Sequence, residues 1–460
     1  LVARGNTNAA LEIAEGSRAR SLVEQLARAN GAAAPSLPTL SDLQRIARQQ
    51  NSTLVQYSIV GSEARVLGIE PQDETHLYIW TIQPSGQIAF RQVELQTMEI
   101  DSIRELVEKA REESIGVTGR GRRGNRPQSQ THLQQLHQLL IEPIADLLPA
   151  DPEARVTFIP QGALFLVPFA ALQDAAGQYL IERHTIVTAP AIQLLSLTPE
   201  TRFSTDGKLA IVGNPTMPSL PGPAGLQQMV SLPGAEEEAN AIAALFDARV
   251  LNGDEATQEN VVQSMRDADI IHLATHGLLD FDADLNAFGE ALDPTLPTAR
   301  ESGVFVTPGA VIVGDRVFVG GIPANIALSR EKVARVAMPG LLALAPTPED
   351  DGFLSAREII QLDLEAQLVV LSACDTGRGR ITGDGVVGLA RSFVAAGVES
   401  VVVSLWAIPD MPTAELMVEF YRNLQQNPDR ARALRRAMLA TKEKYPHPIN
   451  WAAFVLVGEP

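Results

Sequence analysis

Two short segments of the chain carry the residue types of a thiol nucleophile and its base. An apolar run at 269–275 ends before His276 and Gly277, and a second apolar run at 368–373 ends before Cys374. In open α/β sheets, reactive side chains gather at the carboxyl ends of the strands. If the two runs are neighbouring strands, an imidazole and a thiol project from the same edge. The thiolate is the attacking species, and a nearby imidazole lets it form near neutral pH.

The structural interpretation of the same residues is the more common one. A lone cysteine at a strand end is usually a small buried hydrophobe, and a lone histidine is usually a satisfied core residue. His272 lies inside its run, so we expect a core histidine there. If the dyad exists, Gly277 leaves room for a backbone N–H to face an oxyanion, and the N–H of Cys374 is the second donor.

Composition bounds the class of protein. The 460 residues include 37 Lys and Arg against 55 Asp and Glu, a formal net charge of −18, and 45% are hydrophobic. This composition is typical of a folded chain, and the length predicts two or three domains. The acidic balance argues against nucleic-acid binding and against a polybasic membrane anchor. The single cysteine excludes an internal disulfide framework and a zinc site built on cysteine pairs.

The length of the apolar runs and the first residues of the chain bear on where the protein resides. No apolar run reaches the roughly 18 residues of a membrane-spanning helix. The chain opens on Leu1-Val2-Ala3-Arg4, with no Met and no apolar signal core. We therefore expect the C-terminal piece of a longer protein in a reducing cytoplasm.

The first 150 residues predict helices around an antiparallel meander. An apolar stripe predicts one helix over 7–29 that needs a covering neighbour, for which an upstream element is one candidate. Ser41 with Gln44 predicts a capping box for a helix to about Gln50. Short β-branched and aromatic runs predict a meander over 54–95. Helices are expected at 101–113 and 131–148.

From Arg155 onward, continuous apolar strands alternate with helical patterns, which is typical of a parallel sheet covered on both faces. The predicted strands are VTFI, TIVT, LAIV, DIIHLAT, QLVVLS and SVVVSLW, and the predicted helices are 235–246, 257–266, 355–361, 385–397, 411–425 and 428–441. Asp410 is the expected N-cap of the helix at 411–425. The stretch 281–352 is too long for a simple connection and contains a predicted hairpin, VIVGDRVFVGG.

The chain resembles a known family at the two strand exits. HLATHG (272–277) and LSACDTG (371–377) closely resemble the paired motifs of the CHAT family, caspase-like cysteine peptidase domains often carried behind tetratricopeptide repeats. Other segments resemble the family in the same order: ALEIAEGSRARSLVEQLA (10–27), IPQGALFLVPFAAL (159–172), GDGVVGLARSFVAAGVESVVVSLWAIPD (383–410) and PHPINWAAFVLVG (446–458).

The resemblance implies a fold, an activity and a division of the chain. The fold is caspase–haemoglobinase-like: α/β, with a mostly parallel sheet, helices on both faces, and a preceding helical segment and small antiparallel meander. The implied activity is intracellular proteolysis with Cys374 and His276 as the catalytic pair and no metal in the chemical step. The expected parts are a terminal repeat helix (1–30), an adaptor (31–150), an inactive half (151–230) and a catalytic half (231–460) with the insertion 281–352. His184 begins a strand instead of ending one, consistent with the inactive half.

Two groups of charged residues suggest specificity and self-processing. Asp375, Asp384 and Asp410 would place carboxylates around a pocket for Arg or Lys, although loop and cap chemistry explains them as well. An exposed basic loop at 120–126 is an ordinary solvated linker or docking patch, or else a self-processing site of a basic-specific peptidase. Expected partners are a peptide or protein substrate and an activating protein that acts through upstream repeats.

Other motifs are weaker. Calcium-loop spacing is found at four side chains: Asp280, Asp282, Asp284 and Asn286. Position six of the loop is Leu285 instead of the usual Gly, and position twelve is Ala291 instead of the usual Glu, so calcium binding is a secondary hypothesis. GRGRRG (119–124) follows a helix, and GDGVVG (383–388) starts too far from its strand for a phosphate turn. We expect a cysteine endopeptidase. The alternatives are a caspase-shaped scaffold without turnover and a nucleotide switch at 377–388.

Overall fold

In the computed structural model the described residues are 1–29, 36–61, 74–95, 102–116, 131–197, 207–222, 225–278, 304–307, 310–313, 316–319, 340–373, 380–382 and 385–460. All structural statements below concern these residues. None of the helices among them is long and apolar enough to cross a lipid bilayer.

The N-terminal helical stripe is broken into two helices. Helix α1 (Thr7–Gly16) and helix α2 (Arg20–Ala29) are separated by a turn in which Ala19 adopts a left-handed conformation (φ 44°). The prediction of one helix over 7–29 is therefore wrong at this turn. The Arg18 guanidinium is buried there and donates to the carbonyl oxygens of Pro160 and Tyr57. The turn exists because this side chain is directed into the sheet.

The apolar stripe is covered by the chain itself. Leu11 of α1 packs with β1, β2 and α3 in one small core, whereas Val23 of α2 packs in the core of the second half of the chain. Helix α3 (Leu40–Gln49) is capped by Thr39, whose side chain and Asp42 form the capping box. The predicted box at Ser41 and Gln44 starts two residues late.

The meander is the edge of the main sheet. Strands β1 (Ser52–Gly61), β2 (Glu74–Ile82) and β3 (Ile88–Glu94) pair antiparallel, as predicted, and the run at 64–69 lies outside the described residues. Strand β1 also pairs in parallel with β4 (Arg155–Ile159). Helix α4 (Ile103–Ile115) and helix α5 (His132–Leu140), with the 3-10 turn Glu142–Leu147, cover this region.

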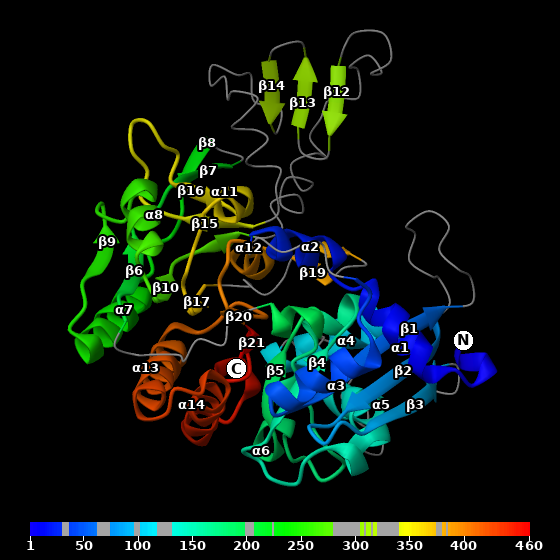
Figure 1. Cartoon of the computed structure of the whole chain (residues 1–460). Helices are drawn as coiled ribbons and strands as arrows, with labels where there is room; N and C mark the ends of the chain where they lie inside the picture. The colour runs from blue at the N-terminus through cyan, green and yellow to red at the C-terminus, as the bar shows by residue number, and fades with distance from the viewer. Residues whose placement is uncertain are drawn as a thin grey trace, which may run out of the picture.

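The main sheet has eleven strands in the order β3-β2-β1-β4-β5-β21-β20-β17-β10-β6-β9 (Figure 1). The remaining strands are β5 (Thr185–Thr188), β6 (Leu209–Pro215), β9 (Val250–Gly253), β10 (Ile270–Ala274), β17 (Leu368–Leu371), β20 (Ser400–Ser404) and β21 (Phe454–Gly458). Across the sheet from β1 to its far edge at β9, every pair of neighbouring strands is parallel except β20 with β21. This one antiparallel pair reverses the strand direction and divides the sheet into two halves.

Helices cover both faces of the second half. Helices α7 (Pro233–Phe246) and α13 (Asp410–Gln426) pack in the larger core, and α8 (Gln258–Arg266), α11 (Ala356–Ile360), α12 (Leu389–Ala395) and α2 pack in the other. Helix α14 (Arg430–Lys444) also packs in the larger core but contacts β5 and β21, where the two halves meet. The short helix α6 (Leu180–Arg183) precedes β5. This architecture confirms the predicted α/β class with a mostly parallel sheet.

Three details differ from the sequence predictions. Strand β6, assigned to the inactive half 151–230, pairs with β10 and β9 in the second half. Helix α12 begins at Leu389, because 385–387 is strand β19, which forms a hairpin with β18 (Arg380–Thr382). Pro409, not Asp410, caps α13, and Asp410 is its first residue. The other domain boundaries stay predictions.

The insertion 281–352 contains two separate pieces of sheet. Strands β13 (Ala310–Val313) and β14 (Arg316–Val319) form the predicted hairpin, and β12 (Val304–Thr307) adds a third antiparallel strand. At its end, β15 (Leu341–Ala343) pairs with β11 (Gly277–Leu278) and with β16 (Phe353–Ser355). A further small hairpin pairs β7 (Ser219–Gly222) with β8 (Gly225–Gln228).

Candidate active site

The strands that precede the predicted dyad are neighbours. Strands β10 and β17 pair in parallel with Leu273 opposite Leu371, and the N–H of Ser372 donates to the carbonyl of Leu273 (3.0 Å). On the other side of β17, the Ser404 hydroxyl donates to the carbonyl of Ala373. The condition that the sequence analysis placed on the dyad, adjacent parallel strands with a common exit edge, is confirmed. Cys374 is the next residue in the chain and lies outside the described residues.

His276 is partly exposed and already has a partner for one ring nitrogen. Its Nε2 lies 2.7 Å from the carbonyl oxygen of Val230, in the segment that leads into α7. A carbonyl oxygen only accepts, so Nε2 is the protonated nitrogen and Nδ1 of the neutral ring keeps its lone pair. The Val230 carbonyl is an orienting group for the ring. A backbone carbonyl leaves no residue-type signal, so the pattern of side chains gave no means of finding it.

The N–H of Gly277 is directed away from the strand that pairs with it. The N–H of Ala343 in β15 donates to the carbonyl of His276 (3.0 Å), which makes this a hydrogen-bonded pair of the antiparallel ladder. Such pairs alternate with non-bonded ones, so the next pair, Gly277 with Leu342, is non-bonded. Strand β11 is an edge strand of its sheet. The Gly277 N–H is therefore directed outward, as an oxyanion donor requires.

Asp410 lies at the same rim as His276. Its Cβ would be 2.6 Å from a Cβ built on Gly234, so the start of α13 packs directly on the start of α7. Gly234 is four residues beyond Val230, the partner of His276. The Asp410 side chain is exposed, and its carboxylate has no hydrogen-bond or ion-pair partner within the described part of the chain. It is not used as a cap, because Pro409 holds that position.

Several predicted residues lie outside the described residues. These are Cys374, Asp375, Asp384, the calcium-loop residues Asp280, Asp282, Asp284 and Asn286, and the basic loop 120–126. Among the residues that are described, no group of three or more His, Cys, Asp or Glu side chains is arranged to hold a metal ion. The hypotheses on these segments stay predictions.

One cavity lies beside the Val230 segment, and another lies at the opposite edge of the sheet. A cavity of about 420 Å³ opens at the ends of β6 and β9 and is lined by Met229 and Ser231, on either side of Val230. A larger cavity, about 1020 Å³, is lined by residues that precede the strands of the second half, including Lys208, Asp269 and Gln367. It therefore lies at the edge opposite His276. Because of this location, and in spite of its size, the cavity takes no part in the chemistry at His276.

The other two histidines singled out from the sequence are structural. His272 is fully buried in β10, as predicted. His184 directly precedes β5 and is buried. Burial, together with the positive charges of Arg183 and Arg435, lowers the pKa of His184 to about 4. It is therefore a neutral residue at physiological pH.

These observations define the class of the protein: mixed α/β, with a mostly parallel sheet and a histidine at a strand exit. The CHAT domain matches residues 130–459, and the chain belongs to this family. This membership confirms the resemblance drawn from the motifs. The mostly parallel sheet with helices on both faces is the fold class that the resemblance implies.

The chain is similar to tetratricopeptide repeat proteins and to two solved structures, one of them a cysteine proteinase. Tetratricopeptide repeat protein 28 of Mus musculus is 30% identical over 348 residues, and that of Homo sapiens is 29% identical over the same length. These alignments cover 71% of this chain and 13% of each relative. A Saccharomyces cerevisiae separase–securin complex is 10% identical (TM-score 0.45; 91% of this chain, 31% of that chain), and gingipain R is 11% identical (TM-score 0.39; 78% and 74%).

Proposed function

We propose that this chain is a cysteine endopeptidase with a Cys374–His276 dyad, the protease part of a longer, regulated protein. The single observation that carries the proposal is the exit of two adjacent parallel strands, one before His276 and one before Cys374, with Nε2 of His276 engaged by Val230. That hydrogen bond leaves Nδ1 as the nitrogen able to accept a thiol proton. A CHAT domain supports the same assignment.

The chemistry follows from these groups. Nδ1 of His276 takes the proton of the Cys374 thiol, and the thiolate sulfur forms a bond to the scissile carbonyl carbon. The N–H groups of Gly277 and Cys374 stabilise the oxyanion, as the outward direction of the Gly277 N–H allows. His276 returns the proton to the leaving amine as the C–N bond breaks. It then activates water, which releases the acyl group and restores the thiol.

Asp410 is the basis for a preference for basic residues. Its carboxylate is exposed at the rim that carries His276 and has no partner among the described residues, so it is available for Arg or Lys of a substrate. Asp375 and Asp384 belong to the same hypothesis. In a fluorogenic peptide panel, Asp410→Asn should reduce turnover after Arg and Lys about 10-fold or more, whereas Glu419→Gln on the same helix should have no effect. Equal turnover after acidic and basic residues by the unmodified protein would refute the preference.

Regulation through upstream repeats has a physical basis in helix α2. Val23 of α2 and Phe393 of α12 belong to one core, and α12 begins soon after the segment that carries Cys374. Figure 1 shows α2 beside α12. The curated relatives carry tetratricopeptide repeat in their names, and we propose that such repeats upstream of α2 displace it when they bind an activating protein.

A scaffold without turnover is the second candidate, because the same fold serves both functions. Peptide cleavage by the purified protein decides between them. Cys374→Ala and His276→Ala, prepared in the same way, should each lose cleavage about 1,000-fold or more if the dyad acts. Cleavage that survives in both variants would come from another enzyme and would contradict the proposal. Mass spectrometry of the active protein also tests self-processing, since an intact 120–126 loop would exclude it.

A further inference from the structure

A buried polar cluster lies beneath the rim, on the strand β10 that leads to His276. His272 is fully buried in β10, and its Nε2 lies 3.0 Å from Oε1 of Glu238 in α7. Its Nδ1 lies 3.2 Å from the hydroxyl of Tyr421 in α13. Glu238 is 3% exposed and Tyr421 is fully buried. Three elements thus place three polar side chains in contact inside the larger apolar core.

The proton positions in this cluster follow from its donors. Burial and the nearby charge of Glu238 raise the pKa of Tyr421 well above its usual range, so the phenol keeps its proton. A Tyr421 hydroxyl that donates to Nδ1 leaves the proton of the ring on Nε2, which faces the Glu238 carboxylate. Nε2 and Oε1 lie 3.0 Å apart, although their geometry falls short of a hydrogen bond.

Such a cluster is not explained by stability alone. Buried charges and polar groups are costly to desolvate, and well-packed apolar residues of the same size often serve a core equally well. The aromatic surroundings make that alternative available here, because Phe246 and Phe420 already pack against the Tyr421 ring at 5.7 and 5.3 Å. What the polar contacts add is a fixed register between the three elements.

The same three elements also build the rim. Glu238 of α7 lies at His272 of β10, and the carbonyl of Val230, three residues before α7, lies at His276, two residues after β10. Helix α13 repeats the arrangement, since Tyr421 reaches His272 while Asp410 packs on Gly234. The two histidines are four residues apart, about 13 Å along a strand. The contacts at the buried His272 are thereby linked to the contacts at the rim through α7, α13 and β10.

From this arrangement we infer that His272, Glu238 and Tyr421 are positioning residues for His276: they lock α7 and α13 to β10 so that the Val230 carbonyl holds the catalytic imidazole. The inference rests on the proposed function. It predicts that the cluster affects the rate of the chemical step rather than the affinity for substrate, because none of its side chains reaches the surface.

Shape-preserving variants of the full chain test this role. Glu238→Gln removes the carboxylate charge beside Nε2, and Tyr421→Phe removes the hydroxyl beside Nδ1, while both keep the size of the side chain. Each should lower kcat for a peptide substrate about 10-fold or more with little change in KM. Each should also move the pH dependence of Cys374 alkylation by iodoacetamide toward that of a free thiol, since His276 is less well held. Phe246→Leu is the matched control, because it loosens the packing on Tyr421 and leaves the polar contacts in place.

The outcomes separate the two proposals. If all three variants lower the melting temperature and none changes kcat or the alkylation profile, the cluster is purely structural and the inference is wrong. If Glu238→Gln fails to fold, Tyr421→Phe decides alone, since it deletes a single oxygen. An unmodified protein that cleaves no peptide and alkylates no faster than a free thiol overturns the proposed function, and the inference with it.

Discussion

Glu15 is a fully buried carboxylic acid at the end of helix α1, where the chain turns into α2. It accepts a hydrogen bond from the N–H of Gln193 (3.0 Å) and lies near the Arg18 charge. Burial nevertheless dominates and raises the pKa of Glu15 from 4.5 to about 7. Between these two values the folded protein holds a proton that the unfolded chain has lost, so the Glu15 contribution to stability decreases as the pH rises through 7.

The substitution Glu15→Gln should remove this pH dependence. Relative to the variant, the free energy of unfolding of the unmodified protein should fall by about 3 kcal/mol between pH 4.5 and 8. Urea denaturation at several pH values measures the difference, which also cancels the opposite contribution of His184. Glu443→Gln, on an exposed site of α14, is the control and should show no such trend. The account would be contradicted if the free energies of unfolding of the unmodified protein and of Glu15→Gln differed by the same amount at every pH in this range.

Residue types predicted the positions of the histidines better than their contacts. His276 and the core role of His272 followed from their positions at the end of an apolar run and inside it. The Val230 carbonyl was missed because any residue type supplies one. Asp410 was assigned to the cap because Asp is a good capping residue, but the chain places Pro409 there and leaves the carboxylate exposed.

At the scale of elements, the contact of α7 with α13 sets the positions of the Val230 carbonyl and Asp410. Gly234 allows this contact, because a methyl group there would lie 2.6 Å from the Asp410 Cβ. Gly234→Ala should therefore displace the start of α7 and lower kcat/KM for a peptide about 10- to 100-fold, since small displacements of catalytic groups are costly. Ala241→Gly, an exposed site on α7, should cost about 1 kcal/mol of stability and leave kcat/KM unchanged. Unchanged turnover in Gly234→Ala would contradict this role of the contact.

Periodicity located the elements but not all of their pairings. The continuous apolar strands of the second half were predictable, because both of their faces are buried. The join between the meander and β4 depends on which edge of β1 is open, and alternation of residues does not encode that. The break between α1 and α2 did have a signal, since Gly16 and Ser17 interrupt the stripe.

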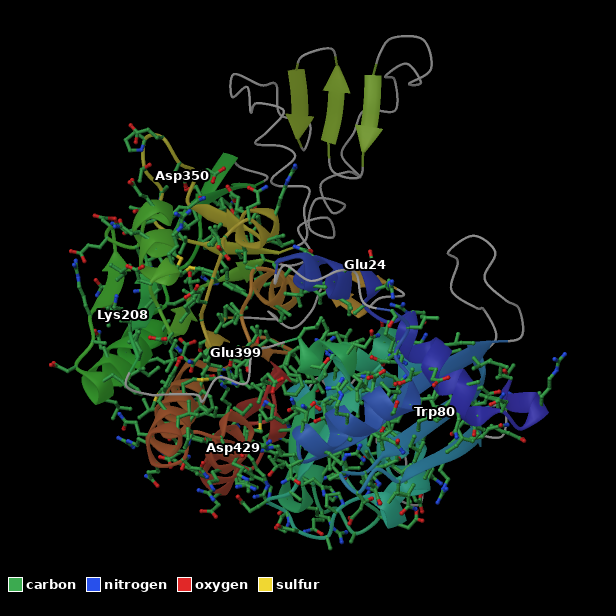
Figure 2. All side chains as sticks on the ribbon, in the orientation of Figure 1. Glu24, Trp80, Lys208, Asp350, Glu399 and Asp429 are labelled. Carbon is green, nitrogen blue, oxygen red and sulfur yellow. The ribbon has the colours of Figure 1, made fainter. Side chains whose placement is uncertain are left out.

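At the scale of the whole molecule, buried ion pairs join the two halves of the sheet near the β20–β21 reversal. Arg430 of α14 pairs with Glu399 at 2.8 Å and donates to Ser400, and Arg155 of β4 pairs with Asp429 at 2.9 Å. Figure 2 shows Glu399 and Asp429 where the halves meet. The strand reversal directs the carboxyl ends of β4 and β5 to the edge opposite His276. The exits of β4 and β5 therefore lie away from the candidate site.

Removal of one member of the buried pair should destabilise the whole chain. Arg430→Ala leaves the Glu399 carboxylate buried without its cation, which costs about 3–5 kcal/mol. Arg422→Ala, which breaks an exposed pair with Glu419, should cost less than about 1 kcal/mol. Chemical denaturation compares the two. Equal small losses would show that the pair does not hold the halves together. The pairing was not predictable, because Glu399 and Arg430 look like ordinary surface residues in the sequence.

The most direct test of the dyad uses the only cysteine in the chain. Iodoacetamide at low dose alkylates Cys374 alone, and mass spectrometry gives the rate as a function of pH. The account predicts alkylation at pH 7 at least about 10-fold faster than for a free thiol of pKa about 8.5, falling toward that rate in a folded His276→Ala variant. Alkylation of the unmodified protein at the rate of a free thiol, or an equal rate in His276→Ala, would contradict it.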